Sequence, residues 1–195
     1  MEIKDSGTRR KFESGAVRDI ANGKGRCDLL PLSVLSIISQ DNIFANLDLY
    51  VRTGYAKYLK LIFEQFVKEH YGNFETAILE VSKHYEDGAK KYSDRNWEKG
   101  IPLHCYIDSA TRHYLKLKRG DKDEPHDRAF LWNILGAWWT YINKPEMIDL
   151  PFGEKPDTQL KCKYRRWFGD YAIHTCDKDD SICDNIAKCT KERVV

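Results

Sequence analysis

The stretch HDRAFLWNILGAWWTYI, residues 126–142, is apolar on almost every side of a helix. A helix of this kind has to be covered on all its faces, so it predicts the centre of a helical core. The segments before it repeat bulky residues every three or four positions, which is the spacing of amphipathic helices. We find no alternating strand pattern of useful length and no internal repeat. The sequence therefore predicts an all-α fold, a bundle of about five helices.

The longest amphipathic pattern runs from Ile43 to Phe66 and predicts one helix. Asn73 follows a Tyr-Gly break and is well placed to cap a second helix over residues 74–92. Pro102 is placed to open a third helix, since proline is favoured in the first turn. Together with residues 126–142, these segments supply most of the expected bundle.

The predicted domain organisation follows from the point at which this pattern ends. After about residue 143 the chain becomes a Pro-rich connector, and the charged tail beyond it holds four of the six cysteines. We expect one domain over residues 1–150 and a small irregular Cys-containing tail over 151–195. The tail lacks the C-x-x-C pair typical of zinc sites, so free thiols are the default expectation in a reducing compartment.

The composition excludes several classes of protein. The hydrophobic fraction of 42% and the charged fraction of 32% are typical of a globular chain rather than a disordered one. A net charge of +2 implies no long-range steering toward nucleic acid. No apolar run approaches the ~20 residues that span a bilayer, and the N-terminus has no apolar signal-peptide core. We expect a cytoplasmic protein that binds neither nucleic acid nor a membrane.

The first cluster that can carry chemistry is HYEDGAKKYSDRNWEKG, residues 84–100. Glu86 and Lys90 lie one turn apart on the flank of the predicted helix. An exposed Glu–Lys pair is the simplest interpretation of that spacing. The alternative is a site in which Glu86 binds a metal ion and the cations of this stretch bind phosphates.

The second cluster is DKDEPHDRAFLWN, residues 121–133. Its carboxylates gather at a helix start, where they cap free N–H groups and complement the macrodipole. Glu124 and Asp127 also form an E-x-x-D pair, a spacing that can hold Mg²⁺ or Mn²⁺ through oxygen ligands. Asn133 lies two turns after His126 in an apolar helix, either as a contact between helices or as a group that faces a base or a metal.

The third cluster is DSATRH, residues 108–113, in which Asp108 and Arg112 lie one turn apart. The two side chains can simply pair with each other. Alternatively, Asp108 joins the metal shell while Arg112 binds a phosphate, because a guanidinium fork matches phosphate oxygens. In combination, the three clusters suit a nucleoside triphosphate, with metal on the carboxylates, cations on the phosphates and an aromatic ring beside the base.

The ordered set GKGRCDLLP, HYEDGAKKYSDRNWEKGIP, DSATRH and GDKDEPHDRAFLWN resembles a phage and bacterial dATP/dGTP diphosphohydrolase-like family, related to the MazG-type all-α nucleotide pyrophosphohydrolases. The resemblance covers about residues 8–150, and it implies that 36–76 is a helical insertion within the domain. It implies a metal-dependent enzyme that cleaves a (deoxy)nucleoside triphosphate, dGTP or dATP, to the monophosphate and pyrophosphate. It also implies a homo-oligomer and, if the protein is phage-encoded, a location in the host cytoplasm.

Site residues are assigned from the clusters and the resemblance together. The cofactor is expected to be Mg²⁺ or Mn²⁺. The catalytic set is Glu86, Asp108, Glu124 and Asp127, the metal ligands are Glu86, Glu124, Asp127 and His126, and the substrate-binding set is Lys90, Lys91, Arg95, Asn96, Trp97, Arg112 and Asn133. MazG-type enzymes carry an E-x-x-E pair that is absent here, so His84 is a further candidate ligand. Two other functions stay open: a non-catalytic nucleotide-binding protein, or an HD-like phosphohydrolase that releases phosphate or triphosphate.

Overall fold

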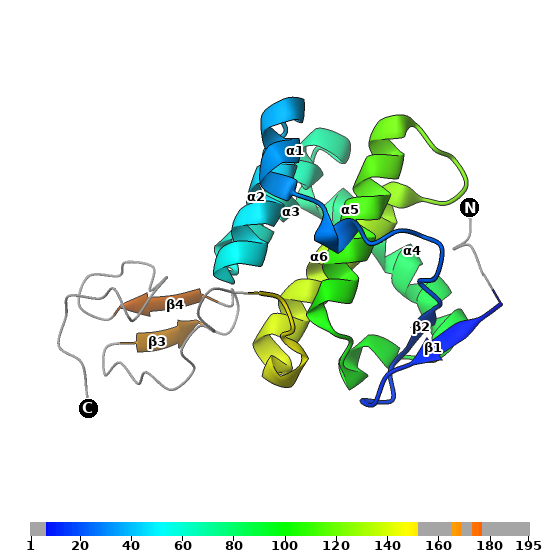
Figure 1. Ribbon diagram of the computed structural model, residues 1–195. Helices are drawn as coiled ribbons and strands as arrows, with labels where there is room; N and C mark the ends of the chain where they lie inside the picture. Colours follow the sequence, from blue (N-terminus) through cyan, green and yellow to red (C-terminus); the bar gives the residue numbers. More distant parts are fainter. Residues whose placement is uncertain (1–6, 152–164, 169–172, 177–195) are drawn as a thin grey trace.

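The computed structural model describes residues 7–151 and the backbone of 165–168 and 173–176 (Figure 1). The side chains of the tail, including its four cysteines, lie outside the described residues. Over the described part the chain is mostly helical, which confirms the predicted all-α class. The α-helices are α1 Leu32–Ser39, α2 Asn42–Thr53, α3 Lys57–His70, α4 Phe74–Tyr92, α5 Leu103–Arg119 and α6 His126–Asn143, and the short 3-10 helices are η1 Cys27–Leu29, η2 Asn96–Lys99 and η3 Pro145–Met147.

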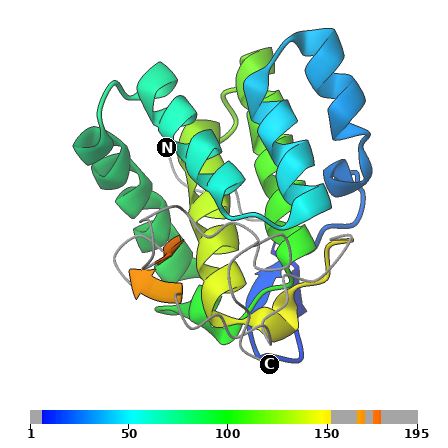
Figure 2. The same ribbon diagram turned by 90° about the vertical axis from the view of Figure 1, so that its left-hand side faces the viewer.

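The bundle is built around α5 and α6, which pack against each other along their length (Figure 2). The rings of Tyr114 on α5 and Phe130 on α6 have centroids 5.2 Å apart. Gly136 allows a still closer approach, since a Cβ at this position would lie 2.3 Å from Cε1 of Tyr106. The apolar stretch 126–142 is therefore a central helix, as its sequence predicts.

The prediction of a single helix over Ile43–Phe66 is wrong, because this segment forms two helices, α2 and α3. Gly54 ends α2 in the left-handed conformation, with φ of 70°, and its N–H donates to the Tyr50 carbonyl at 2.8 Å. This is the usual way in which glycine terminates a helix. The bulky residues on both sides of the break face the molecule's own core.

Two predicted helix starts are confirmed. The Asn73 Oδ1 accepts a hydrogen bond from the Thr76 N–H at 2.9 Å, so its side chain caps α4. Pro102 directly precedes α5. No helix in the described part of the chain is both long and apolar enough to cross a bilayer.

The structure also contains strands that the sequence does not predict. β1, Arg9–Lys11, pairs antiparallel with β2, Val17–Asp19, and β3, Arg165–Phe168, pairs in the same way with β4, Ile173–Cys176. Strands of three or four residues are too short to display an alternating pattern. The β1–β2 ribbon lies beside α4 (Figure 1), and an ion pair of 2.7 Å between Asp19 and Lys91 joins the two.

Candidate functional site

A cavity of about 960 Å³ lies between the β1–β2 ribbon, α4, η2 and the facing sides of α5 and α6. This volume is within the range of pockets that hold small molecules. Its aromatic lining is formed by Tyr85, Tyr92, Trp97 and Trp132. Its charged lining is formed by Arg10, Arg18, Asp19, Lys24, Glu86, Asp94, Arg95, Glu98, Asp108, Arg112, Lys116 and Glu124.

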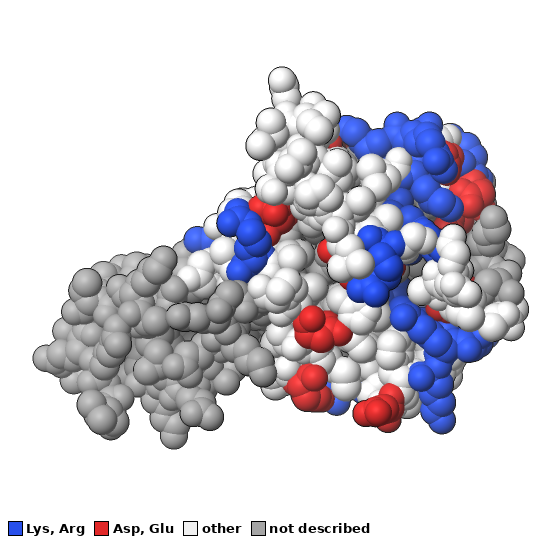
Figure 3. Space-filling view, viewed as in Figure 1, with Lys and Arg blue, Asp and Glu red and all other residues white. Residues whose placement is uncertain are grey.

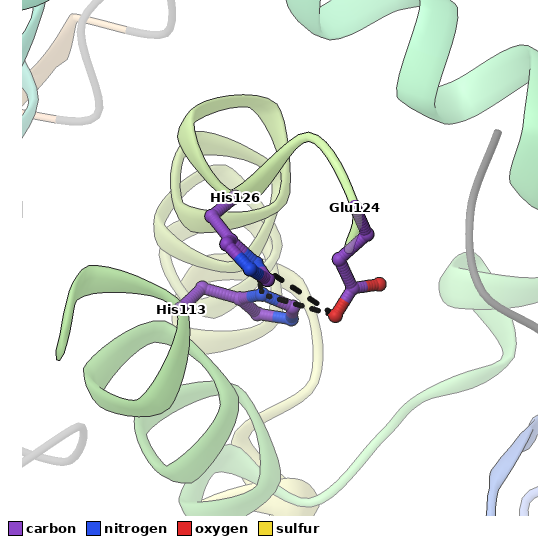
Figure 4. Close-up of side chains that lie close together, drawn as sticks. All are labelled: His113, Glu124 and His126. Carbon is purple, nitrogen blue, oxygen red and sulfur yellow. Dashed lines mark hydrogen bonds and ion pairs between the residues drawn. The ribbon is translucent and has the colours of Figure 1, made fainter. Parts of the chain in front are cut away.

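Three potential metal ligands converge on one wall of this region: His113 on α5, Glu124 in the following turn and His126 at the start of α6 (Figure 4). The Nδ1 atoms of the two histidines lie 3.1 Å apart. The Glu124 Oε1 lies 3.6 Å from the His113 Nδ1 and 3.7 Å from the His126 Nδ1. Two imidazoles and one carboxylate form a donor set used by catalytic metal sites, which leave further positions for water or substrate.

A second carboxylate orients one of these histidines. The His126 Nε2 lies 2.8 Å from the Asp123 Oδ1. Because a carboxylate only accepts hydrogen bonds, the imidazole donates through Nε2, and in the neutral ring Nδ1 then offers a lone pair toward His113 and Glu124. Hydrogen bonds from Lys116 and His126 lower the pKa of Asp123, which keeps it ionised.

The other predicted metal ligands lie elsewhere. Asp127 accepts a hydrogen bond from the Tyr71 hydroxyl at 2.8 Å, on the side of the turn between α3 and α4. Glu86 lines the cavity, but its side chain is 64% exposed and its Oε1 accepts from the Lys90 Nζ at 2.6 Å. The structure thus groups Glu124 and His126 with His113, while Glu86 and Asp127 point to separate surroundings.

Asp108 and Arg112 form an ion pair with each other on α5. Asp108 is buried and also accepts from the Cys27 N–H at 2.7 Å. Arg112 donates to the carbonyl oxygens of Lys24 and Gly25, both at 3.2 Å. Both side chains line the cavity, and both fasten the N-terminal loop across it.

The predicted cations of α4 and η2 are mostly engaged with carboxylates. Lys90 contacts Glu86 on the surface, and Arg95, whose side chain is 76% exposed, contacts Glu98. Lys91 is buried against Asp19, at 2.7 Å. Of these three, only Arg95 is among the residues that line the cavity.

Three further residues of the predicted substrate-binding set, Asn96, Asn133 and Trp97, differ in their surroundings. Asn96 is buried, its Oδ1 accepts from the Val17 N–H at 2.9 Å, and its Nδ2 donates to the Val17 carbonyl at 2.8 Å. Asn133 accepts from Arg18 at 3.0 Å and donates to the Ala129 carbonyl at 2.7 Å. Trp97 lines the cavity, and its ring packs edge-on against the ring of Trp139 on α6.

Several residues that line the cavity have no site role predicted from sequence, among them Arg10, Arg18, Lys24 and His113. The sequence signal for His113 is its place in DSATRH, and that for Lys24 is the GKG string around it. The arginines belong to strands too short to recognise. His84, a candidate ligand by sequence, is buried with Nδ1 unpaired within the described residues, and burial lowers its pKa to about 4, with Arg18 adding to the effect.

Comparison with known protein families gives a match over part of the chain. Residues 59–150 match the family model described as dATP/dGTP diphosphohydrolase, N-terminal. The match covers α3 to η3, and hence the histidines and Glu124, but not the β1–β2 ribbon. It begins inside the segment 36–76, whose status as an insertion stays a prediction. Neither the curated proteins nor the solved structures provide a match to the chain.

Proposed function

We propose that this chain, whose residues 59–150 match the dATP/dGTP diphosphohydrolase, N-terminal, family model, hydrolyses dATP or dGTP to the monophosphate and pyrophosphate. The observation that carries the proposal is the convergence of His113, Glu124 and His126 beside a charged cavity. Hydrolysis of a triphosphate needs charge neutralisation and a positioned water more than it needs covalent chemistry. The cavity offers cations and aromatic rings in the same space.

The residues present fit a divalent cation. His113 and His126 supply nitrogen atoms, Glu124 supplies oxygen, and Asp123 orients His126 from behind. When bound, such a cation lowers the pKa of coordinated water and neutralises charge on phosphate oxygens. Because Mg²⁺ prefers ligand sets made of oxygen alone, two imidazoles favour Mn²⁺ over Mg²⁺.

The chain's own groups have distinct proposed tasks around this centre. Burial, with His126 adding to it, holds the pKa of His113 well below its usual value, so its imidazole stays neutral and able to bind a cation. Lys116, whose Nζ lies 3.9 Å from Glu124, places positive charge next to the reacting phosphate. Trp97 and Trp132 offer ring surface to a purine base. Asp108 and Arg112 act as positioning residues that hold the loop over the cavity.

The experiment that tests the proposal is incubation of the purified chain with each NTP and dNTP, in Mn²⁺ or Mg²⁺, followed by separation of the products. We expect dATP or dGTP to give the monophosphate and pyrophosphate, with faster turnover in Mn²⁺. Release of phosphate or triphosphate instead would favour the HD-like alternative. Absence of turnover with every nucleotide, in a folded protein, would contradict the proposal and favour a binding protein.

We propose in addition that the protein is a homo-oligomer. The predicted interface over residues 43–66 is not available as a whole, since Ile43, Leu47, Ile62 and Phe66 are buried in the core of the same chain. Exposed apolar side chains gather instead on and before α1, where Ile37 and Ile38 are 76% and 75% exposed and the surface carries few charged side chains (Figure 3). Others, such as Leu79, are scattered over the remaining helices. Light scattering of the full chain tests the assembly, and a monomer at high concentration would contradict it.

A further inference from the structure

Two arginines face each other across the β1–β2 ribbon. Arg10 on β1 is the register partner of Arg18 on β2, and both line the cavity. Like charges directly opposite each other on two paired strands destabilise the pair. A ribbon that only had to cover the bundle would gain from a neutral or acidic residue at one of these positions.

Neither arginine has an ion-pair partner among the described residues. Arg18 donates three hydrogen bonds, all to neutral acceptors: the Cys105 carbonyl and the Ser109 hydroxyl at 3.2 Å, and the Asn133 Oδ1 at 3.0 Å. A guanidinium has five N–H donors, so two of those on Arg18 are left for a ligand. Burial lowers its pKa, yet an arginine keeps its proton in proteins.

The surroundings hold Arg18 in a fixed orientation. Its guanidinium lies 5.3 Å from the ring centroid of Tyr106 and 5.4 Å from that of Trp132. Such contacts pre-organise the flat group without neutralising its charge. On Arg10 the Nε atom is buried and has no hydrogen-bond partner within the described residues. An unsatisfied buried donor is costly unless a bound ligand accepts from it.

The acidic residue of the ribbon does not compensate these charges. Asp19 pairs with Arg9 at 3.1 Å and with Lys91 at 2.7 Å. Its charge is therefore already matched by two cations other than Arg10 and Arg18. The ribbon thus presents two uncompensated guanidinium groups to the same cavity that the histidines adjoin.

We propose that Arg10 and Arg18 bind the two terminal phosphates of the substrate, which leave together as pyrophosphate; this rests on the proposed function. Two planar cations side by side match two linked phosphates, and each guanidinium can bind phosphate oxygens in a forked manner. The pair makes the site selective for triphosphates over monophosphates. Both arginines precede residues 59–150, so this clamp is supplied by a part of the chain outside the matched family segment.

The test is calorimetric titration of the full chain with inorganic pyrophosphate and, separately, with dAMP, both in Mn²⁺. Arg10→Gln and Arg18→Gln are each expected to weaken pyrophosphate binding at least ten-fold, while dAMP binding changes less than two-fold. The matched control is Lys11→Gln, which removes an equal charge from an exposed position on the same ribbon and is expected to bind both probes as the parent does. Arg10→Gln is also expected to melt no lower than the parent, because it removes a like-charge contact.

Several results would overturn the inference. If folded Arg10→Gln binds pyrophosphate within two-fold of the parent, the pair is not the clamp, whether or not Arg18→Gln folds. A change in the preference between dATP and dGTP, with pyrophosphate binding unaltered, would assign Arg18 to the base. The proposed function is tested separately by turnover of the parent chain. The two proposals can fail separately. If the parent protein turns over no nucleotide, but Arg10→Gln still weakens pyrophosphate binding, the proposed reaction is refuted and the phosphate-binding role of the arginine pair is supported.

Discussion

The Nδ1 atoms of His113 and His126 lie 3.1 Å apart, although thirteen residues separate the two in the chain. The turn after α5 makes this possible, because Gly120 ends the helix with φ of 85° and the chain returns directly into α6. Glu124 lies in the same turn. Two helix ends and one loop therefore bring together three potential metal ligands at the edge of the cavity.

The two carboxylates of the E-x-x-D pair should differ sharply when neutralised. Glu124→Gln is expected to lower kcat by about 10²-fold or more, because the group next to both histidines is lost. Asp127→Asn is expected to keep most of the activity, since its carboxylate serves Tyr71. The kcat of Glu86→Gln, measured in the same assay, tests whether the Glu86 carboxylate on α4 takes part in the reaction. Equal losses in all three variants would show that the ligand set predicted from sequence is the better one.

Removal of the metal should lower stability as well as activity. A cation that binds only the folded state at 100 times its Kd contributes about 2.7 kcal/mol. For a chain of this size, that corresponds to a fall in Tm of roughly 5–10 °C on chelation. Scanning calorimetry with EDTA, and then with Mn²⁺ or Mg²⁺ restored, measures the change. His113→Asn should melt at the same temperature with and without EDTA.

Asn96 should prove to be important for stability rather than for recognition of the base. Its amide satisfies both the N–H and the carbonyl of Val17, so Asn96→Ala leaves two backbone groups without a partner. The expected cost is about 1–3 kcal/mol, measured by urea unfolding. The ratio of dATP to dGTP turnover is expected to stay as in the parent. A changed ratio at unchanged stability would place Asn96 against the base.

His84 should make the protein sensitive to mild acid. Its pKa of about 4 in the folded state lies below the ordinary value of 6.5, chiefly because of burial. The unfolded state therefore gains the proton first, and stability is lost as the pH falls from about 6.5 toward 4. Between pH 7.5 and 4.5 this loss is of the order of 2–3 kcal/mol. We expect His84→Gln to lose less over that interval, and an identical loss in both proteins would refute the assignment.

Gly136 should tolerate no larger side chain. A Cβ there would lie 2.3 Å from the Tyr106 ring, which is itself buried and cannot turn away freely. Gly136→Ala is expected to cost about 1–3 kcal/mol in the free energy of unfolding, although alanine is the better helix former. The double variant with Tyr106→Leu should recover part of that loss. No loss in the single variant would mean that α5 and α6 pack less closely.

The helices near the site could be predicted with useful accuracy. Apolar residues recur in their sequences every three to four positions. The cap at Asn73 and the start at Pro102 are local signals as well. Gly54 is also a local signal, for the end of a helix. The amphipathic pattern continues on both sides of it and therefore favoured a single helix. The resemblance to a family was recognisable because most of its strings lie in or next to those helices, although GKGRCDLLP lies in the N-terminal loop and η1. Local physics thus determined the fold class, whereas the kind of chemistry was indicated by the resemblance to a known family.

Partnerships between distant side chains could not be predicted in this way. Asn96 looks equally free to bind a base or a backbone until β2 is placed beside it. His113 becomes a candidate ligand only when the turn brings it to His126, and the Arg10–Arg18 pair exists only in the register of a ribbon of three-residue strands. The sequence by itself determined which groups are present and which helix faces are apolar. Tertiary structure alone decided which of them meet, because hydrogen bonds and ligand shells require contact in space and carry no period along the chain.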